Sequence, residues 1–158
     1  MRKIFSALLH KEMARNDNIV LLTGDLGYGL WDRIRIDYND RFYNVGSSEQ
    51  LLLGAASGMA MEGKIPIVYS ITPFLLYRPF EIIRNYLDHE RVCVKLVGGG
   101  RDRDYGYLGF SHWAEEDMEV MKTFKNIVSM KPSTEDELQY QFGEFMNNGK
   151  PSYINLKR

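Results

Sequence analysis

Short apolar runs alternate along the chain with segments whose apolar residues recur at helical spacing. The first helical segment places Ile4, Phe5, Leu8, Leu9 and Met13 on one face. The other runs are continuously apolar, which is typical of strands that are covered on both faces of a sheet. Strands are therefore expected at residues 19–23, 42–46, 65–70, 92–97, 127–130 and 153–156.

Helices are expected between these strands, at residues 50–62, 79–89, 115–124 and 134–147. Gly63 is well placed to end the first of these helices. Thr134 and Glu137 have the spacing of a capping box at the start of the last one. The alternation of strands and helices predicts an α/β fold with three layers, α/β/α, and a mostly parallel sheet of about six strands.

Composition narrows the class of protein. The 158 residues are 44% hydrophobic, enough for the core of one domain spanning residues 1–158. Lys plus Arg number 20 and Asp plus Glu 21, a balance that excludes a strongly basic nucleic-acid binder. No apolar run approaches the roughly 20 residues of a membrane span. One cysteine, Cys93, excludes an internal disulfide and a thiolate zinc site. We expect a cytoplasmic protein with no metal site of its own and no membrane partner.

Candidate chemistry lies in the loops that follow the strands, because ligands bind at the carboxyl ends of parallel strands. These loops hold Gly24 and Asp25, residues 46–49, residues 71–78 and residues 98–112. Neither a dinucleotide-binding glycine fingerprint nor a Walker loop is present. The three glycines at residues 98–100 fit either an anion cradle or a mobile loop.

Glu49 is the most informative acid, because it follows a strand and opens a helix that is apolar and small-sided nearly all round. Such a helix is expected to be buried, against the rest of the chain or against a partner. An acid in the first turn of a helix complements the helix dipole. A carboxyl at the buried mouth of the helix is equally suited to proton exchange. The spacing alone leaves both interpretations open.

Several motifs together carry a family resemblance. They are GSSEQ at residues 46–50, GAASGMA at 54–60, GKIP at 63–66, PF at 73–74, RPFE at 78–81 and SH at 111–112. On these motifs the chain resembles the pyrimidine-binding domain of transketolases and deoxyxylulose-phosphate synthases, which are thiamine diphosphate enzymes. The resemblance covers essentially the whole chain, and it is closer to transketolases than to 2-oxo acid decarboxylases.

The resemblance implies roles for five residues. Glu49 would hydrogen-bond N1′ of the aminopyrimidine ring and so favour the imino tautomer that removes the proton from C2. Phe74 would stack on the pyrimidine, and Tyr77 would wall the same pocket. His112 would face the substrate as a second catalytic residue, and Asp25 would approach the cofactor or the subunit interface. A core position for Phe74 and a merely exposed position for His112 remain the alternatives.

Basic residues extend the implied site. Arg158 matches the arginine that binds the sugar phosphate, whereas a free chain end is the alternative interpretation. Arg101 and Arg103 are further candidate anion contacts, or else parts of a solvated loop. Trp31 and Trp113 flank the loops and are candidates for a pocket or an interface.

The magnesium-binding Gly-Asp-Gly motif of the family is absent, since Gly24 and Asp25 are followed by Leu26. We therefore expect a free-standing pyrimidine-domain subunit that shares its thiamine diphosphate site with a separate diphosphate-binding subunit. That partner would hold the magnesium, in an α₂β₂ assembly or around a homodimer core. The implied reaction moves a two-carbon ketol unit between sugar phosphates or related carbonyl substrates. A 2-oxo acid decarboxylase subunit and a non-catalytic regulatory subunit are the alternatives.

Overall fold

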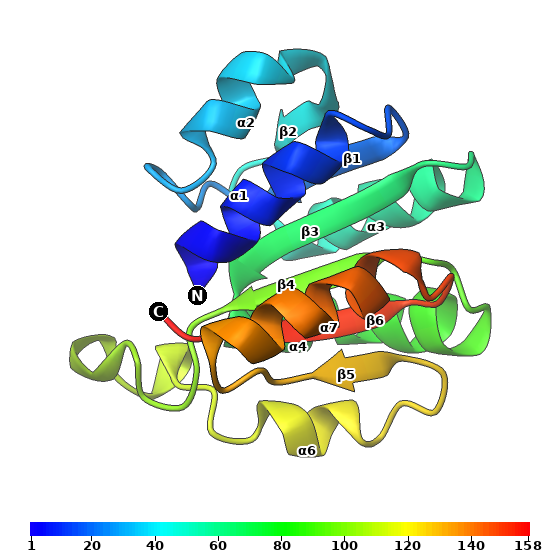
Figure 1. Cartoon of the computed structure of the whole chain (residues 1–158). Coiled ribbons are helices and arrows are strands. Elements are labelled where there is room, and N and C mark those ends of the chain that lie inside the picture. Colours follow the sequence, from blue (N-terminus) through cyan, green and yellow to red (C-terminus); the bar gives the residue numbers. More distant parts are fainter.

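Six parallel strands form one sheet in the computed structural model, which describes residues 1–158 (Figure 1). The strand order is β2-β1-β3-β4-β6-β5, and every pairing is parallel. The strands are β1 (Ile19–Thr23), β2 (Phe42–Asn44), β3 (Ile65–Ile71), β4 (Lys95–Gly99), β5 (Val128–Met130) and β6 (Ser152–Leu156). The predicted α/β fold and its parallel sheet are confirmed.

Helices connect these strands. The α-helices are α1 (Arg2–Met13), α2 (Asp32–Asp37), α3 (Glu49–Met61), α4 (Thr72–Tyr77), α5 (Phe80–Ile82), α6 (Asp117–Met121) and α7 (Glu135–Asn147). Short 3₁₀ turns lie at η1 (Asn39–Arg41), η3 (Gly106–Leu108) and η4 (Phe110–His112), and η2 (Ile83–His89) is a π-helix. None of these helices has the length and apolar character needed to cross a bilayer.

The sheet is covered on both faces, as the continuously apolar strands predict. In β1, Ile19 and Leu21 join a core cluster with α1 and α7. The alternate residues Val20 and Leu22 join the opposite cluster with α3, α4 and η2. Figure 1 shows α1 and α7 together on one side of the sheet and α3 and α4 on the other.

The carboxyl edge of the sheet collects the loops that matter for function. From β1 the chain passes to β2 on one side, whereas from β3 it passes to β4 on the other side. The order therefore reverses between β1 and β3, which is where ligands bind in open α/β sheets. Figure 1 shows both chain termini near this edge.

Strand β4 differs from the prediction, because it spans Lys95–Gly99 rather than residues 92–97. A Cβ atom at Gly98 would lie 2.7 Å from Thr72 Oγ1, and one at Gly99 would lie 2.5 Å from the Tyr69 hydroxyl oxygen. Gly98 and Gly99 are thus buried strand residues that allow close packing. Neither an anion cradle nor a mobile loop describes these two positions.

Several helices also differ from the prediction. The segment expected as a loop at residues 71–78 forms α4, and α2 was not expected. The helix expected at residues 79–89 is the short α5 followed by the π-helix, and the one expected at 115–124 is only Asp117–Met121. Helices of one or two turns depend on tertiary packing rather than on local sequence, so periodicity does not mark them.

The predicted end of α3 and the predicted start of α7 agree with the structure. Gly63 follows α3 with a φ of +84°, and the Thr134 hydroxyl accepts from the Glu137 N–H over 3.1 Å at the start of α7. The α3 helix is not buried all round, however, since Leu51 and Met61 are more than half exposed. Some apolar residues of α3 therefore face solvent.

Candidate active site

Glu49 is held inside the protein at the first residue of α3, with 3% of its surface exposed. Its Oε2 accepts from Nη1 of Arg78 at 2.8 Å, and its Oε1 accepts from the Ser70 hydroxyl at 3.4 Å. Gly24 directly follows β1, and a Cβ atom there would lie 3.2 Å from the Gly46 carbonyl oxygen and 3.8 Å from Glu49 Oε1. The carboxylate is thus buried where β1, β3 and α3 meet.

A chain of contacts leads from this carboxylate to Phe74 and His112. Arg78 stacks on Phe74, and Phe74 packs against His112. The Arg78 guanidinium carbon is 3.8 Å from the centroid of the Phe74 ring, one helical turn away on α4. The Phe74 and His112 rings form an edge-to-face pair with centroids 4.8 Å apart. The structure therefore brings together three residues predicted for the site and adds Arg78, whose contact with Glu49 is not indicated by the sequence motifs.

His112 ends the η4 turn and is half-buried. Its Nδ1 lies 3.0 Å from the Ser111 hydroxyl, and its ring centroid lies 6.0 Å from that of Tyr105. The imidazole is packed between Phe74 and Tyr105 rather than free in solvent.

Tyr77, predicted to wall the same pocket, packs partly against the core cluster of α3 and β3. Its hydroxyl is buried without a hydrogen-bond partner. Burial, and then the neighbouring Glu116 carboxylate, raise the pKa of Tyr77. The side chain is directed toward the start of α6, so a role in cofactor binding stays a prediction.

Asp25 is exposed after β1 and has a φ of +59°, a conformation uncommon for a residue with a side chain. Its carboxylate accepts from the Tyr28 hydroxyl and, over 3.4 Å, from the Asn44 side chain. The hydrogen bond from Tyr28, followed by that from Asn44, lowers the pKa of Asp25. Asp25 is thus a fixed anion at the edge of the sheet, and its cofactor-binding role stays a prediction.

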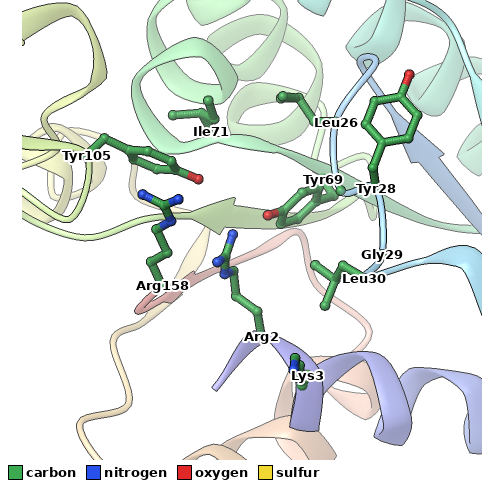
Figure 2. A pocket seen from close by; sticks show the side chains of 11 residues that line it. Arg2, Lys3, Leu26, Tyr28, Gly29, Leu30, Tyr69, Ile71, Tyr105 and Arg158 are labelled. Atoms are coloured by element: carbon green, nitrogen blue, oxygen red, sulfur yellow. The ribbon is translucent and has the colours of Figure 1, made fainter. Parts of the chain in front are cut away.

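A cationic pocket of about 510 Å³ opens at the same edge (Figure 2). Arg2, Lys3 and Arg158 line it together with Tyr69 and Tyr105, and no acidic residue does. Figure 2 shows the Arg2 and Arg158 guanidinium groups directed into the space between the two tyrosines. Burial raises the pKa of Tyr69, so this phenol stays neutral beside the cations. We call this site the cationic pocket.

Arg158 is exposed, and it contacts Asp104 and Tyr105. Its backbone N–H donates to Asp104 over 2.7 Å, and its guanidinium carbon lies 4.8 Å from the Tyr105 ring centroid. Because Tyr105 also packs against His112, it joins the cationic pocket to the group around Glu49.

Arg2 and Lys3 were not selected from the sequence, although a signal for them exists. A helix that precedes a parallel strand runs back along the sheet, so its first residues lie at the carboxyl ends of the strands. Positive residues at the start of α1 are therefore candidates for the same edge as Arg158.

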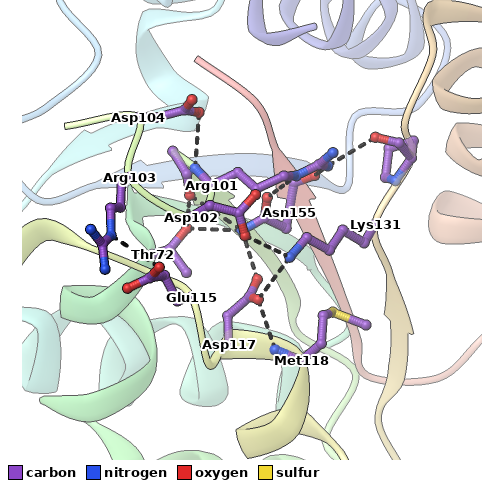
Figure 3. A network of polar contacts seen from close by, with 12 residues as sticks. Thr72, Arg101, Asp102, Arg103, Asp104, Glu115, Asp117, Met118, Lys131 and Asn155 are labelled. Atoms are coloured by element: carbon purple, nitrogen blue, oxygen red, sulfur yellow. Dashed lines mark hydrogen bonds and ion pairs between the residues drawn. The ribbon is translucent and has the colours of Figure 1, made fainter. Parts of the chain in front are cut away.

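Arg101 belongs to a network of polar contacts (Figure 3). It is 8% exposed, and its guanidinium donates to Asn155 Oδ1 at 2.9 Å and to the carbonyls of Pro132 and Asn155 at 2.8 Å. It does not line the cationic pocket. These contacts join the loop after β4 to β6, and they do not support the substrate-binding role, which stays a prediction.

Asp117 is the centre of the same polar network, fully buried at the start of α6 (Figure 3). Its carboxylate accepts from Asn155 at 2.7 Å, from the Tyr153 hydroxyl at 2.8 Å and from Lys131 at 3.4 Å. Burial, and then the Asp117 charge, raise the pKa of Tyr153 well above its usual range. The network fixes both ends of the loop that carries His112.

The two tryptophans divide between core and surface. Trp31 is 1% exposed and packs edge-to-face on Phe5 and Tyr69, so its prediction as a pocket or interface residue is wrong. The amphipathic helix α1 reaches over it and covers the ring. Trp113 is half-buried, with the Arg103 guanidinium carbon 4.3 Å from its ring centroid, and Arg103 also pairs with Glu115.

Comparison with known proteins shows the family of this chain. The family model described as transketolase, pyrimidine binding domain, matches residues 1–158. One subunit of the apulose-4-phosphate transketolase of Actinobacillus succinogenes is 34% identical over 120 residues, which are 76% of this chain and 39% of that protein. A putative transketolase C-terminal section of Methanocaldococcus jannaschii is 30% identical over 159 residues, which are 100% of this chain and 50% of that protein.

A solved structure described as a split gene transketolase, inactive beta4 tetramer, has a TM-score of 0.86 and 28% identity. The match covers 99% of this chain and 51% of that one. The chain thus spans about half, or less, of the length of these relatives. Because the family model matches from the first residue to the last, the chain belongs to the transketolase pyrimidine-binding domain family.

Proposed function

We propose that this chain is the pyrimidine-binding subunit of a split transketolase-like enzyme. The enzyme binds thiamine diphosphate and transfers a two-carbon ketol unit between sugar phosphates. One observation carries the proposal: a buried carboxylate, Glu49, lies beside a half-buried aromatic ring, Phe74, and a histidine, His112, at the carboxyl edge of the sheet.

The residues present fit the aminopyrimidine ring of that cofactor. The ring needs an aromatic face to stack on and a carboxyl group to meet its ring nitrogen. The Arg78 guanidinium, which is also planar and rich in nitrogen, makes both kinds of contact here, 3.8 Å from the Phe74 centroid and 2.8 Å from Glu49. A flat group with N–H donors is therefore accommodated between these two side chains.

The side chains of the site have separable tasks. When bound, thiamine diphosphate supplies the nucleophilic carbon that carries the two-carbon unit. Glu49 holds a proton at N1′ of the pyrimidine ring, and Phe74 orients the ring by stacking. His112 moves a proton at the carbonyl or hydroxyl oxygen of the substrate, and its packing against Phe74 and Tyr105 fixes its orientation.

The cationic pocket is the proposed site of the substrate phosphate. Guanidinium groups recognise phosphate by paired hydrogen bonds, and Arg2 and Arg158 approach the pocket from opposite ends of the chain. Tyr105 connects this pocket to His112, so one extended substrate could reach both. A phosphate site favours sugar phosphates over the small unphosphorylated substrates of a 2-oxo acid decarboxylase.

The proposal includes a separate subunit that binds the diphosphate and magnesium. Two of the relatives bear the names of a transketolase subunit and of a transketolase C-terminal section, which is consistent with such a division of the enzyme. The shared site would lie where the carboxyl edge of this sheet meets the partner, in an α₂β₂ assembly or around a homodimer core. The single, free Cys93 agrees with a reducing cytoplasm.

Glu49→Gln tests the proposal in the chain co-expressed with the transketolase amino-terminal-half protein of the same genome. Glutamine keeps the size of the side chain but holds no transferable proton, so hydrogen–deuterium exchange at C2 of the bound cofactor should slow by about 10²-fold or more. Glu62→Gln, at the exposed end of the same helix, is the matched control and should exchange normally. Equal exchange rates in all three proteins would refute the role of Glu49.

The shared site has its own test. Calorimetry should show tight, magnesium-dependent binding of thiamine diphosphate only when both proteins are present. Tight binding by this chain alone would contradict a division of the site between two subunits.

A further inference from the structure

We propose that Arg78 is an internal occupant of the aminopyrimidine site, which the ring of the cofactor must displace in order to bind. The inference rests on the proposed function and concerns the regulation of that same site. The Arg78 guanidinium lies 2.8 Å from the Glu49 carboxylate and 3.8 Å from the Phe74 centroid. It covers the two groups to which the cofactor ring is assigned.

The guanidinium and the aminopyrimidine share the features that the site recognises. Both are planar and both have π faces. The aminopyrimidine protonated at N1′ also presents to the carboxylate an N–H on an N–C–N fragment, as the guanidinium does. A carboxylate that accepts a hydrogen bond and an aromatic ring that stacks will therefore bind either one. Only 2% of the Glu49 side chain is exposed, and its two oxygen atoms accept from Arg78 and Ser70, so the ring cannot bind the carboxylate while Arg78 occupies it.

Arg78 is weakly held compared with the buried Arg101. Its side chain is 49% exposed, and its hydrogen bond to Glu49 is the only one that the side chain makes in the protein. Arg101, by contrast, is 8% exposed and donates to three oxygen atoms. The Arg78 head group can therefore leave by side-chain rotation while the backbone stays in place.

The rotation would leave helix α4 unchanged. Arg78 is the C-terminal cap residue of α4, and Pro79 fixes the backbone that follows. Rotamer changes of exposed side chains take picoseconds to nanoseconds, so they do not limit the rate of binding.

Arg78 stabilises the subunit while no cofactor is bound. A buried carboxylate without a partner is costly, and Arg78 supplies that partner until the cofactor arrives. The same contact lowers the affinity for the pyrimidine ring, because the ring has to replace an ion pair and a stacked cation. Binding then depends on the additional grip on the diphosphate, which couples cofactor loading to assembly with the partner.

The test uses the full chain and a probe without diphosphate, 4-amino-5-hydroxymethyl-2-methylpyrimidine, titrated by NMR. Arg78→Gln should bind this probe roughly tenfold more tightly than the unmodified chain, the scale of one lost stacked ion pair. Arg84→Gln is the matched control, because Arg84 is exposed on η2 and bonds only to Asn85. Its affinity for the probe should equal that of the unmodified chain.

Methylguanidinium gives a second readout. In Arg78→Gln it should occupy the vacated place and compete with the pyrimidine probe, whereas in the unmodified chain it should not bind there. If Arg78→Gln proves unfolded in a thermal melt, Arg78→Lys replaces it. Lysine keeps the charge but loses the plane, so the affinity for the probe should rise by a smaller factor.

Equal or weaker probe binding by the folded Arg78 variant, or no competition by methylguanidinium, would overturn the inference. The Glu49→Gln exchange experiment separates this result from failure of the proposed function. If Glu49→Gln loses C2 exchange while the Arg78 variant gains no affinity, only the occupant role is wrong. If C2 exchange is unaffected by Glu49→Gln, the proposed function itself fails.

Discussion

The side-chain amide of Asn155, near the end of β6, donates to the buried carboxylate of Asp117 over 2.7 Å. This hydrogen bond spans 38 residues of sequence and joins the strand before Arg158 to the loop after His112. Both candidate substrate contacts therefore depend on one buried polar centre. A fully satisfied network of this kind fixes a single arrangement of its loops, because each unpaired group would be costly.

Asp117→Asn is expected to destabilise the protein by about 2–3 kcal/mol. Oδ2 of Asp117 accepts from Asn155 and Tyr153, and Oδ1 accepts from Lys131. In either orientation the new amide therefore brings N–H donors to face donors, and buried hydrogen bonds are lost. Urea denaturation measures the change. Asp17→Asn is the control, since Asp17 is exposed, and it should change the free energy of unfolding by about 0.5 kcal/mol or less. Equal changes in the two variants would show that the network is not a stabilising centre.

Two glycine-to-alanine substitutions should change the free energy of unfolding in opposite directions. Gly99→Ala puts a Cβ atom 2.5 Å from the Tyr69 hydroxyl oxygen and 2.9 Å from its ring carbon, so β3 and β4 must shift. We expect a loss of about 1–3 kcal/mol. Gly143→Ala meets nothing within 4 Å and lies inside α7, where alanine should stabilise by roughly 0.5–1 kcal/mol. Thermal melts of both variants, compared with the parent, would contradict this if Gly99→Ala melted higher.

Most strands could be predicted because their apolar runs are long enough to identify buried segments. The predicted position of β4 is wrong by a few residues, because an apolar run at residues 92–94 precedes the strand and because Gly98 and Gly99 resemble a loop. What selects their strand conformation is pairing with β3 and β6, together with the rings of Tyr69 and Tyr153. These contacts come from distant parts of the chain and leave no periodic pattern.

The candidate active site also depends on contacts between distant residues that leave no pattern in the sequence. The family resemblance identified Glu49, Phe74 and His112, which the structure brings together. Arg78 lies within one of the motifs that carry the resemblance, yet its ion pair with Glu49 joins positions 29 residues apart. That contact depends on a side-chain rotamer and on the turn from β3 into α4, neither of which is visible in a linear pattern.

Arg158→Ala and Arg2→Ala, in the complex with the diphosphate-binding partner, should weaken the use of phosphorylated substrates. Each removes a charge-assisted contact, so KM for a sugar phosphate should rise by about tenfold to a hundredfold. KM for an unphosphorylated ketose should stay the same. Lys125→Ala removes a positive charge at the opposite edge of the sheet and should change neither value. Equal rises in KM for both substrates would exclude a phosphate-specific pocket.

Lys95 is a buried lysine whose ammonium group has no carboxylate partner. It is 1% exposed, and it donates to Asn148 Oδ1 at 2.7 Å, to the Lys150 carbonyl at 2.8 Å and to the Ser152 hydroxyl at 3.4 Å. Burial lowers the pKa of Lys95 below its ordinary value of 10.5. The hydrogen bonds therefore hold the turn between α7 and β6, but the charge itself opposes folding.

A lowered lysine pKa makes stability depend on pH in a definite direction. Below the folded-state pKa both states carry the proton, and the cost of burying the charge is fully present. Between that pKa and 10.5 the unfolded chain binds a proton that the folded chain has released, so the free energy of unfolding rises with pH. Above 10.5 both states are neutral and the cost has gone.

Lys95→Met isolates this dependence. Methionine leaves the three oxygen atoms without their donor at every pH, so the variant should be less stable than the parent by an amount that grows as pH rises toward 10.5. Urea denaturation of both proteins at several pH values between about 7 and 10 gives this difference as a curve. Lys125→Met, an exposed lysine, should give a flat curve. A difference that stayed constant or shrank with rising pH would mean that burial does not lower the pKa of Lys95.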